Sequence, residues 1–310
     1  MNRLFITAIA PLLWGTTYIV TTEFLADYGP LTVGVLRALP VGLAILLIYQ
    51  TLPSGSWWWR SFLLGFLNIG LFFGLLFFAT FRLPGGLVAT IGAIQPLVVI
   101  MISWFWLNQR PGLVTLFASL VGIMGVGLLV LGPITALDLA GILAAFAAAF
   151  SMAAGVVLTK HWGRPVPLIE FTGWQLISGG LVLIPAAYFF EADSWLLPSL
   201  RNVTGFAWLA ILNTGVGYFL WFRGIEKLQS WEVSFLGLLS PIVAVSAGYV
   251  ILGQTFSAVQ GFGILLIFAG IVGSQAFKDG LSLKQLNSAL PVALRERDRF
   301  GPHRPHTCDK

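Results

Sequence analysis

Charged residues and cysteines are scarce in this chain. Of its 310 residues, 57% are hydrophobic and only 9% are charged, whereas soluble domains carry about 25% charged residues. This composition excludes a soluble globular enzyme. The single cysteine, Cys308, excludes an intramolecular disulfide bond.

Groups that commonly carry chemistry are also missing from the apolar part of the chain. Its acidic residues fall at the ends of the apolar segments, its three histidines lie outside those segments, and no Walker-type glycine loop is present. The sequence therefore predicts no catalytic residues, no metal site and no cofactor. A proton relay through a buried carboxylate is disfavoured for the same reason.

Ten apolar stretches occupy most of the first 277 residues, each about long enough to cross the roughly 30 Å hydrocarbon core of a bilayer as a helix. Lipid offers no partner to unpaired backbone groups, and the alternation typical of barrel strands is absent, so we expect helices. The stretches are 4–22, 31–49, 61–80, 85–107, 113–131, 137–159, 170–190, 205–221, 232–252 and 259–277. The predicted fold class is an all-α membrane protein with ten transmembrane helices.

Positive charge is distributed unevenly between the two sides of the predicted membrane protein. With both termini in the cytoplasm, seven Lys and Arg residues of the body lie inside, and only Arg82 and Arg201 lie outside. This bias satisfies the positive-inside rule and predicts a multi-pass protein of the bacterial inner membrane with both termini cytoplasmic. The net charge of +5 then requires no nucleic-acid partner.

The last segment, residues 278–310, is basic and mixed in charge. We expect it to be disordered or to rest on anionic headgroups on the cytoplasmic side. His303, His306 and Cys308 are interpreted as parts of this solvated tail rather than as metal ligands.

The chain contains an internal repeat. Residues 64–127 align without gaps with residues 209–272 at a constant offset of 145, with 17 identities in 64 columns. Because Asn, Gln, Pro and Gly match in register, chance hydrophobic similarity does not explain the alignment. An offset of 137 relates the helices that precede these segments in each half.

Each half of this repeat contains five predicted helices. Since five is an odd number, the second half must be inverted relative to the first. Inverted repeats related by an axis in the membrane plane are typical of transporters, whose substrate site lies near the midplane between the halves. The repeat thus predicts alternating access.

Short motifs connect the sequence to a known family. They are 13–18 (LWGTTY), 36–38 (LRA), Pro96 with 107–109 (LNQ), 240–245 (SPIVAV) and 252–254 (LGQ). With these motifs, residues 1 to about 275 resemble the ten-helix EamA-type family of the drug/metabolite transporter superfamily. Gln109 and Gln254 depart from this pattern, because members commonly end these helices with Leu-x-Glu.

The resemblance implies a division into a first EamA-like repeat (1–131), a second repeat (137–277) and the tail. It implies a transporter, not an enzyme, that exports amino acids or their derivatives and other small metabolites across the inner membrane. Its expected partners are a small-molecule substrate and the lipid bilayer, and the oligomeric state is undetermined. An exporter of drugs or organic cations is the alternative, and a membrane enzyme or assembly factor is a third possibility.

Arg37 is the only charged side chain clearly inside a predicted span. It either binds a substrate carboxylate through paired hydrogen bonds or has a structural role at helix breaks or the interface. Asn68 and Asn213 are matched by the repeat, and they either line the cavity or join neighbouring helices.

Two further pairs in the fourth and ninth spans are Gln95-Pro96 and Ser240-Pro241. A proline inside a helix removes one backbone hydrogen bond. We therefore expect kinks that free the carbonyls of Gly92 and Gly237 for substrate contact or hinge motion, or that serve packing alone.

Aromatic and polar residues cluster in the first span and in the second half. They either form a box around an apolar or aromatic side chain or serve as packing and interfacial anchors. These candidates are Trp14, Thr17, Tyr18, Trp174, Gln175, Tyr218 and Trp221.

Overall fold

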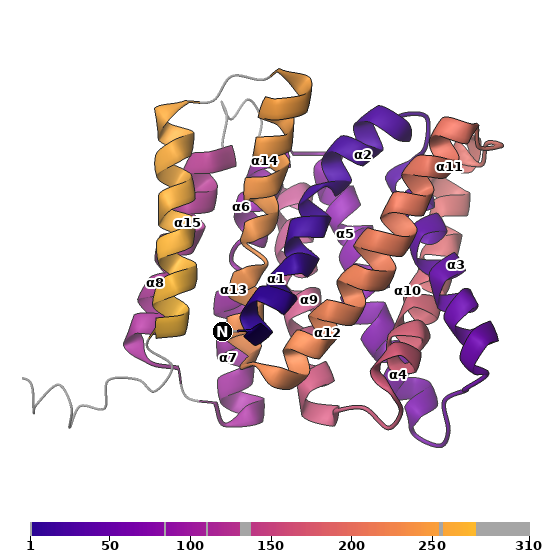
Figure 1. The fold of residues 1–310 in the computed structure, drawn as a ribbon, viewed down its shortest axis with the longest axis horizontal. Helices are drawn as coiled ribbons and strands as arrows, with labels where there is room; N and C mark the ends of the chain where they lie inside the picture. The colour runs from indigo at the N-terminus through magenta and orange to yellow at the C-terminus, as the bar shows by residue number, and fades with distance from the viewer. Residues whose placement is uncertain (1, 84, 110, 131–137, 254–256, 277–310) are drawn as a thin grey trace, which may run out of the picture.

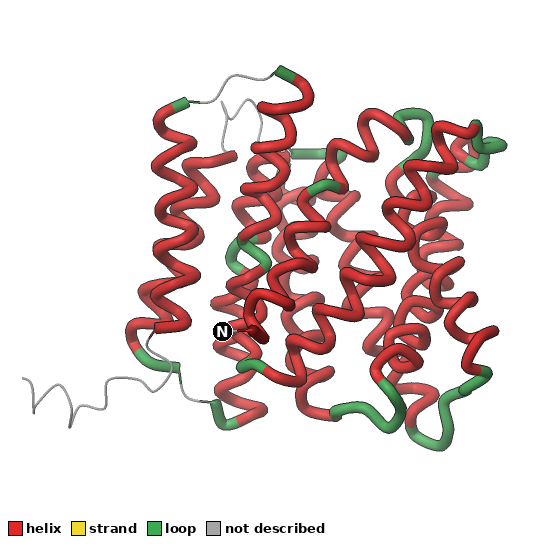
Figure 2. Tube along the Cα trace, in the orientation of Figure 1, coloured by secondary structure: helices red, strands yellow, loops and turns green. Residues whose placement is uncertain are grey.

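The computed structural model describes residues 2–83, 85–109, 111–130, 138–253 and 257–276 (Figure 1). Helices fill these residues almost completely, and no strand occurs in them (Figure 2). Ten helical segments are long and apolar enough to cross a membrane, so the prediction of ten transmembrane helices is confirmed. The predicted tail, residues 278–310, lies outside the described part of the chain.

Five spans are single, uninterrupted α-helices. They are α3 (Pro30–Tyr49), α8 (Leu113–Val130), α9 (Leu139–Trp162), α10 (Leu168–Phe190) and α15 (Ala258–Ala276). Local signals set their ends. Asp138 caps α9 by accepting a hydrogen bond from the Gly141 backbone at 2.6 Å, so this helix starts two residues later than its apolar pattern suggests.

The other five spans are interrupted. The first is α1 (Asn2–Gly15) and α2 (Thr17–Phe24); the third is α4 (Trp57–Gly65), the π-helix η1 (Phe66–Gly70) and α5 (Leu71–Thr80); the fourth is α6 (Gly85–Gly92) and α7 (Gln95–Leu107); the eighth is α11 (Leu200–Ala207), the π-helix η3 (Trp208–Val216) and α12 (Gly217–Lys227); the ninth is α13 (Ser230–Leu236) and α14 (Leu239–Leu252). A short 3₁₀ turn, η2 (Ala192–Ser194), follows α10.

The eighth span is longer than the sequence predicts. The apolar stretch is 205–221, but the helical segment runs over Leu200–Lys227. Ser199 and Asn202 form a capping box that starts the helix, and its last turns carry charged residues that end the apolar window early. Hydropathy alone thus locates the membrane core of a span rather than the ends of its helix.

Two pairs of spans pack closely through small residues. α15 lies along α8, and α10 lies along α3. A Cβ atom at Gly263 would lie 2.7 Å from the carbonyl oxygen of Gly125, and a Cβ at Gly125 would lie 2.8 Å from that of Gly263. Only glycine permits this approach of two backbones, which is the packing that membrane helices favour.

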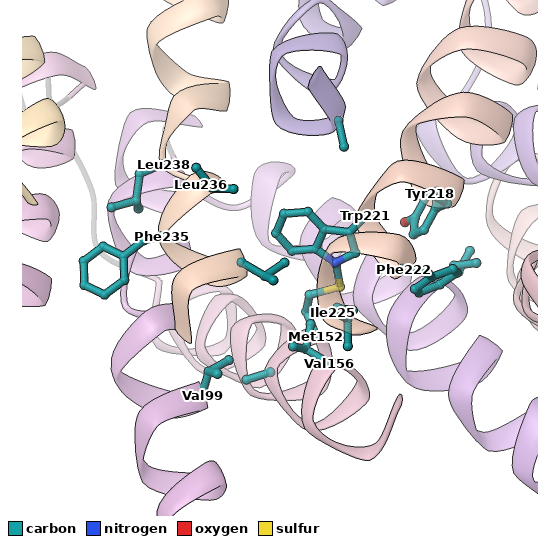
Figure 3. Close-up of a cluster of buried hydrophobic side chains, with 14 of the residues drawn as sticks. Val99, Met152, Val156, Tyr218, Trp221, Phe222, Ile225, Phe235, Leu236 and Leu238 are labelled. Atoms are coloured by element: carbon teal, nitrogen blue, oxygen red, sulfur yellow. The ribbon is translucent and has the colours of Figure 1, made fainter. Parts of the chain in front are cut away.

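The largest buried side chains form a core in the middle of the bundle. They include Trp221, Tyr218 and Phe222 of α12 and Phe235 of α13. Figure 3 shows Trp221 and Ile225 of α12 with Met152 and Val156 of α9 in this core. Because Trp221 also borders the cavity described next, the core forms one of the cavity walls.

Candidate functional site

A cavity of about 310 Å³ lies among α1–α3, α5–α7, α9 and α12–α14. Its walls are mainly apolar. Phe72, Phe73 and Phe77 line it from α5, while alanines and Met152 line it from α9. Its polar side chains are few and come from several spans, which is the usual composition of a small-molecule site.

The structure places nine of the sequence-predicted residues in the wall of this cavity. These are Trp14, Thr17, Arg37, Gln95, Pro96, Tyr218, Trp221, Ser240 and Pro241. The other five do not line it: they are Tyr18, Asn68, Trp174, Gln175 and Asn213. Tyr18 is 51% exposed on the outside of the bundle, and Trp174 donates a hydrogen bond from Nε1 to the carbonyl of Thr51 at 2.8 Å.

Arg37 is buried in α3, with 4% of its surface exposed. Its Nε donates a hydrogen bond to Thr214 Oγ1 at 2.8 Å, and its guanidinium carbon lies 5.3 Å from the centre of the Phe73 ring. No Asp or Glu is among the described residues that line the cavity. The positive charge of Arg37 therefore has no carboxylate partner in the cavity wall, an arrangement that favours an anionic ligand.

Three aromatic side chains form one side of the cavity. The ring of Trp14 lies 5.2 Å from that of Tyr218 and 5.0 Å from that of Trp221. Trp14 is held by a hydrogen bond from its Nε1 to the carbonyl of Asn213 at 2.8 Å. Tyr218 is held similarly, because its hydroxyl donates to the carbonyl of Asn68 at 3.3 Å.

The fourth and ninth spans break where they meet the cavity. Pro96 is the second residue of α7 and Pro241 is the third of α14, positions that a proline tolerates because its missing N–H is not needed in a first helical turn. The carbonyl of Gly237 accepts a hydrogen bond from the Ser240 backbone at 3.1 Å. The expectation that Pro241 frees this carbonyl is therefore wrong, because the chain re-forms the bond in a tighter turn.

Gly92 lies in the cavity wall beside the break in the fourth span. A Cβ atom at this residue would meet nothing within 4 Å. The space in front of Gly92 is thus part of the cavity, and a larger side chain there would fill it.

Asn68 lies in η1 and is fully buried. Its Nδ2 donates to Gln175 Oε1 at 2.8 Å and to Thr159 Oγ1 at 3.3 Å. We call these three side chains the Asn68 cluster. It joins the third span to the sixth and seventh.

Asn213 lies in η3 and is also fully buried. Its Nδ2 donates to Thr17 Oγ1 at 3.0 Å and to Thr16 Oγ1 at 3.3 Å. We call these three side chains the Asn213 cluster. It joins the eighth span to the break between α1 and α2, next to the cavity.

The acidic residues that an organic-cation site would use lie elsewhere. Glu232 is in the first turn of α13, where Oε2 accepts the backbone N–H of Gln229 at 2.9 Å. Glu170 is in the first turn of α10 and borders a narrow crevice with Trp174. Neither residue lines the cavity.

Sequence reasoning missed the phenylalanines of α5 and Ser234 of α13, which also line the cavity. Phe73 and Phe77 are four residues apart and so share a face of α5. In a span as apolar as this one, nothing in the sequence distinguishes that face from one that contacts lipid. The sequence also did not predict the two π-helical segments, although it paired the asparagines that lie in them.

Comparison with known proteins identifies close relatives. The profile of the EamA-like transporter family matches the chain twice, over residues 2–131 and 139–274. Protein PecM of Dickeya dadantii is 45% identical over 265 residues, which cover 85% of this chain and 89% of PecM. A probable amino-acid metabolite efflux pump of Escherichia coli is 26% identical over 272 residues, which cover 83% of this chain and 89% of the pump.

A solved crystal structure has the same fold. It superposes with a TM-score of 0.77 at 18% sequence identity and covers 90% of this chain and 98% of the other. At this identity the similarity concerns the fold alone.

Proposed function

Because the chain belongs to the EamA-like transporter family, we propose that it exports amino acids or their derivatives by alternating access. The family and its relatives are membrane transporters, so the chain is a multi-pass membrane transporter and not an enzyme. The substrate class and the direction of transport are the proposed parts. The relatives have membrane transport in common, and the proposal adds a substrate class and a direction to it.

The cavity is the observation that carries this proposal. Its volume of about 310 Å³ is at the small end of the range of about 300–1,000 Å³ for ligand sites, which suits a metabolite of amino-acid size. Arg37 provides a cation that can bind a carboxylate with paired hydrogen bonds. The aromatic side of the cavity can cover an apolar side chain.

Alternating access requires two similar halves that can exchange arrangements. Three observations support the inverted repeat: the family profile matches each half separately, both halves carry a π-helix at the repeated asparagine, and the fourth and ninth spans both break near the repeated prolines. The close pairs α3–α10 and α8–α15 each join a span to its counterpart in the other half. In this proposal, the breaks at Pro96 and Pro241 are the hinges.

The proposed orientation places both termini in the cytoplasm. The start of α1 and the end of α15 lie toward the same side of the bundle (Figure 1). Arg60 at the start of α4, Lys160 at the end of α9 and Lys227 at the end of α12 belong to that side. The positive-inside rule then assigns it to the cytoplasm.

The alternative, an exporter of organic cations, needs a negative partner in the cavity. Among the described cavity residues there is none, and Glu170 and Glu232 lie elsewhere. The cavity chemistry therefore favours metabolites that carry a carboxylate.

The test is transport by the purified full chain in liposomes. Vesicles are loaded with one amino acid or derivative, and exchange is followed with a labelled panel that includes N-acylated amino acids, with and without a proton gradient. We expect exchange of at least one of these solutes. Gly92→Leu, which fills the cavity, should abolish exchange without lowering the unfolding temperature. Absence of exchange for the whole panel would overturn the proposal.

A further inference from the structure

We propose that the transported solute is an organic anion: a carboxylate on an apolar or aromatic body that carries no free ammonium group, such as an N-acylated amino acid. This inference rests on the proposed function, because it names the chemical class that the same cavity takes. It separates derivatives with a blocked amine from free amino acids.

The charge of the cavity is the first reason. Arg37 is the only charged side chain among the described cavity residues. Thr214 is its only hydrogen-bond partner in the described part of the chain, and the bond uses Nε, so the two terminal nitrogens of the guanidinium group are available to a ligand. A buried cation without a counter-charge is costly, and a carboxylate supplies that charge in a bidentate geometry.

Two further donors are the second reason. Gln95 Nε2 and Trp221 Nε1 are buried, and neither has a hydrogen-bond partner among the described residues. Both side chains belong to the cavity wall. Buried donors without a partner are destabilising. Because both atoms are enclosed by protein, they can donate to the carboxylate or acyl oxygen of an N-acylated amino acid once their side chains turn toward the cavity.

An ammonium group has no comparable site. Arg37 repels it, and no described cavity residue is acidic. Thr17 Oγ1, which accepts a hydrogen bond from Asn213 at 3.0 Å, and Ser234 Oγ, which donates to the carbonyl of Ser230 at 3.0 Å, are neutral acceptors and supply no negative charge. The net positive charge of the cavity thus selects against the cationic part of a zwitterion.

The apolar walls define the body of the solute. Trp14, Tyr218 and Trp221 lie with ring centres 5.0–5.2 Å apart around Trp14, and Phe73 and Phe77 lie on α5. These rings can cover an aromatic or branched apolar group. A small polar solute would leave them uncovered.

Three probes with the same body and different charges test this inference in liposomes that contain the full chain. They are N-acetylphenylalanine, an anion; phenylalanine, a zwitterion; and phenylalanine amide, a cation. We expect N-acetylphenylalanine to be exchanged at least about tenfold faster than phenylalanine, and the amide not to be exchanged. Binding of the amide by the aromatic rings alone would instead make it the preferred probe.

The outcomes separate the two proposals. Equal or faster exchange of phenylalanine or its amide overturns this inference and leaves the transporter proposal intact. If other free amino acids are exchanged but none of the three probes is, this inference is likewise overturned and the transporter proposal stays intact. Absence of exchange for the whole panel overturns both proposals.

Variants link the selectivity to named groups. Arg37→Gln should lower the preference for N-acetylphenylalanine over phenylalanine at least about tenfold and raise the KM for N-acetylphenylalanine. Arg37→Lys should restore part of this preference. Arg60→Gln, which removes a positive charge away from the cavity, is the matched control. If Arg37→Gln does not fold, Gln95→Leu in the cavity wall is compared with Gln109→Leu, which lies just beyond the end of the same helix and does not line the cavity. An unchanged preference in the folded cavity variant would overturn the inference.

Discussion

The Asn68 and Asn213 clusters occupy equivalent places in the two halves and differ in what their side chains do. Asn68 and Asn213 both lie in π-helical segments and are fully buried. The Asn68 amide bonds to Thr159 and Gln175, which do not line the cavity. The Asn213 amide bonds to Thr17, which does.

The backbones of the two asparagines, in contrast, act alike. The carbonyl of Asn68 accepts from the Tyr218 hydroxyl at 3.3 Å, and the carbonyl of Asn213 accepts from Trp14 Nε1 at 2.8 Å. A π-helix changes the backbone hydrogen-bond pattern locally and is common at functional sites. Here, the repeated feature is a carbonyl that holds a cavity aromatic, while the side-chain bonds have diverged.

The largest effect should come from crowding the Asn68 cluster. Gly155 of α9 faces the amide of Asn68, and a Cβ atom there would collide with it. Gly155→Val should displace the amide, break its two hydrogen bonds and lower the free energy of unfolding by about 3 kcal/mol. The unfolding temperature in detergent measures this. Gly92→Ala, which faces open space, is the control. An unchanged unfolding temperature for Gly155→Val would contradict this prediction, because it would show that the Asn68 cluster can rearrange at little cost in free energy.

Removing the Asn68 amide itself should have the next largest effect. Asn68→Leu leaves Gln175 and Thr159 without this partner in a buried place and should cost about 2 kcal/mol of stability. Transport per folded molecule should change little, because the amide does not line the cavity. Stability and exchange are measured on the same preparation. A selective loss of exchange without loss of stability would contradict the packing role.

Asn213→Leu should show the opposite pattern. Its amide bonds to Thr16 and Thr17 at the break between α1 and α2, where the cost of its loss should be about 1 kcal/mol. Because Thr17 borders the cavity, exchange should fall by about tenfold. The same two measurements apply. If Asn68→Leu and Asn213→Leu behaved identically, the distinction between the clusters would be lost.

The ten spans could be predicted from the sequence, because lipid imposes long apolar segments. The sequence also singled out Arg37, Pro96 and Pro241, which the structure places in the cavity wall, since a charge within a span demands a local reason. The sequence paired Asn68 with Asn213 but gave no basis for telling them apart. Their difference depends on which side chains of the other half meet them, and that is fixed by packing between distant helices.

Other features depend on local backbone geometry or on which face of a helix meets a neighbour. Tyr18 is near the cavity residues Trp14 and Thr17 in sequence, but the break at Thr16 turns it outward. Thr16 Oγ1 accepts a hydrogen bond from Trp208 at 3.0 Å and donates to the carbonyl of Leu13 at 2.7 Å, a competition with the helical backbone bonds that favours a break. No pattern of apolar residues reports such a contact.

The smallest effects should come from the pair Trp14→Phe and Tyr218→Phe, which tests the shared backbone role. Each change keeps an aromatic ring in the cavity and removes one hydrogen bond to a π-helical carbonyl, so each should cost about 1 kcal/mol of stability. Because the two bonds are equivalent, we expect similar losses, unlike the divergent results for the two asparagines. Unfolding temperatures of both variants, with Tyr188→Phe on the exposed end of α10 as control, measure this. A loss confined to one variant would show that the backbone roles have diverged as well.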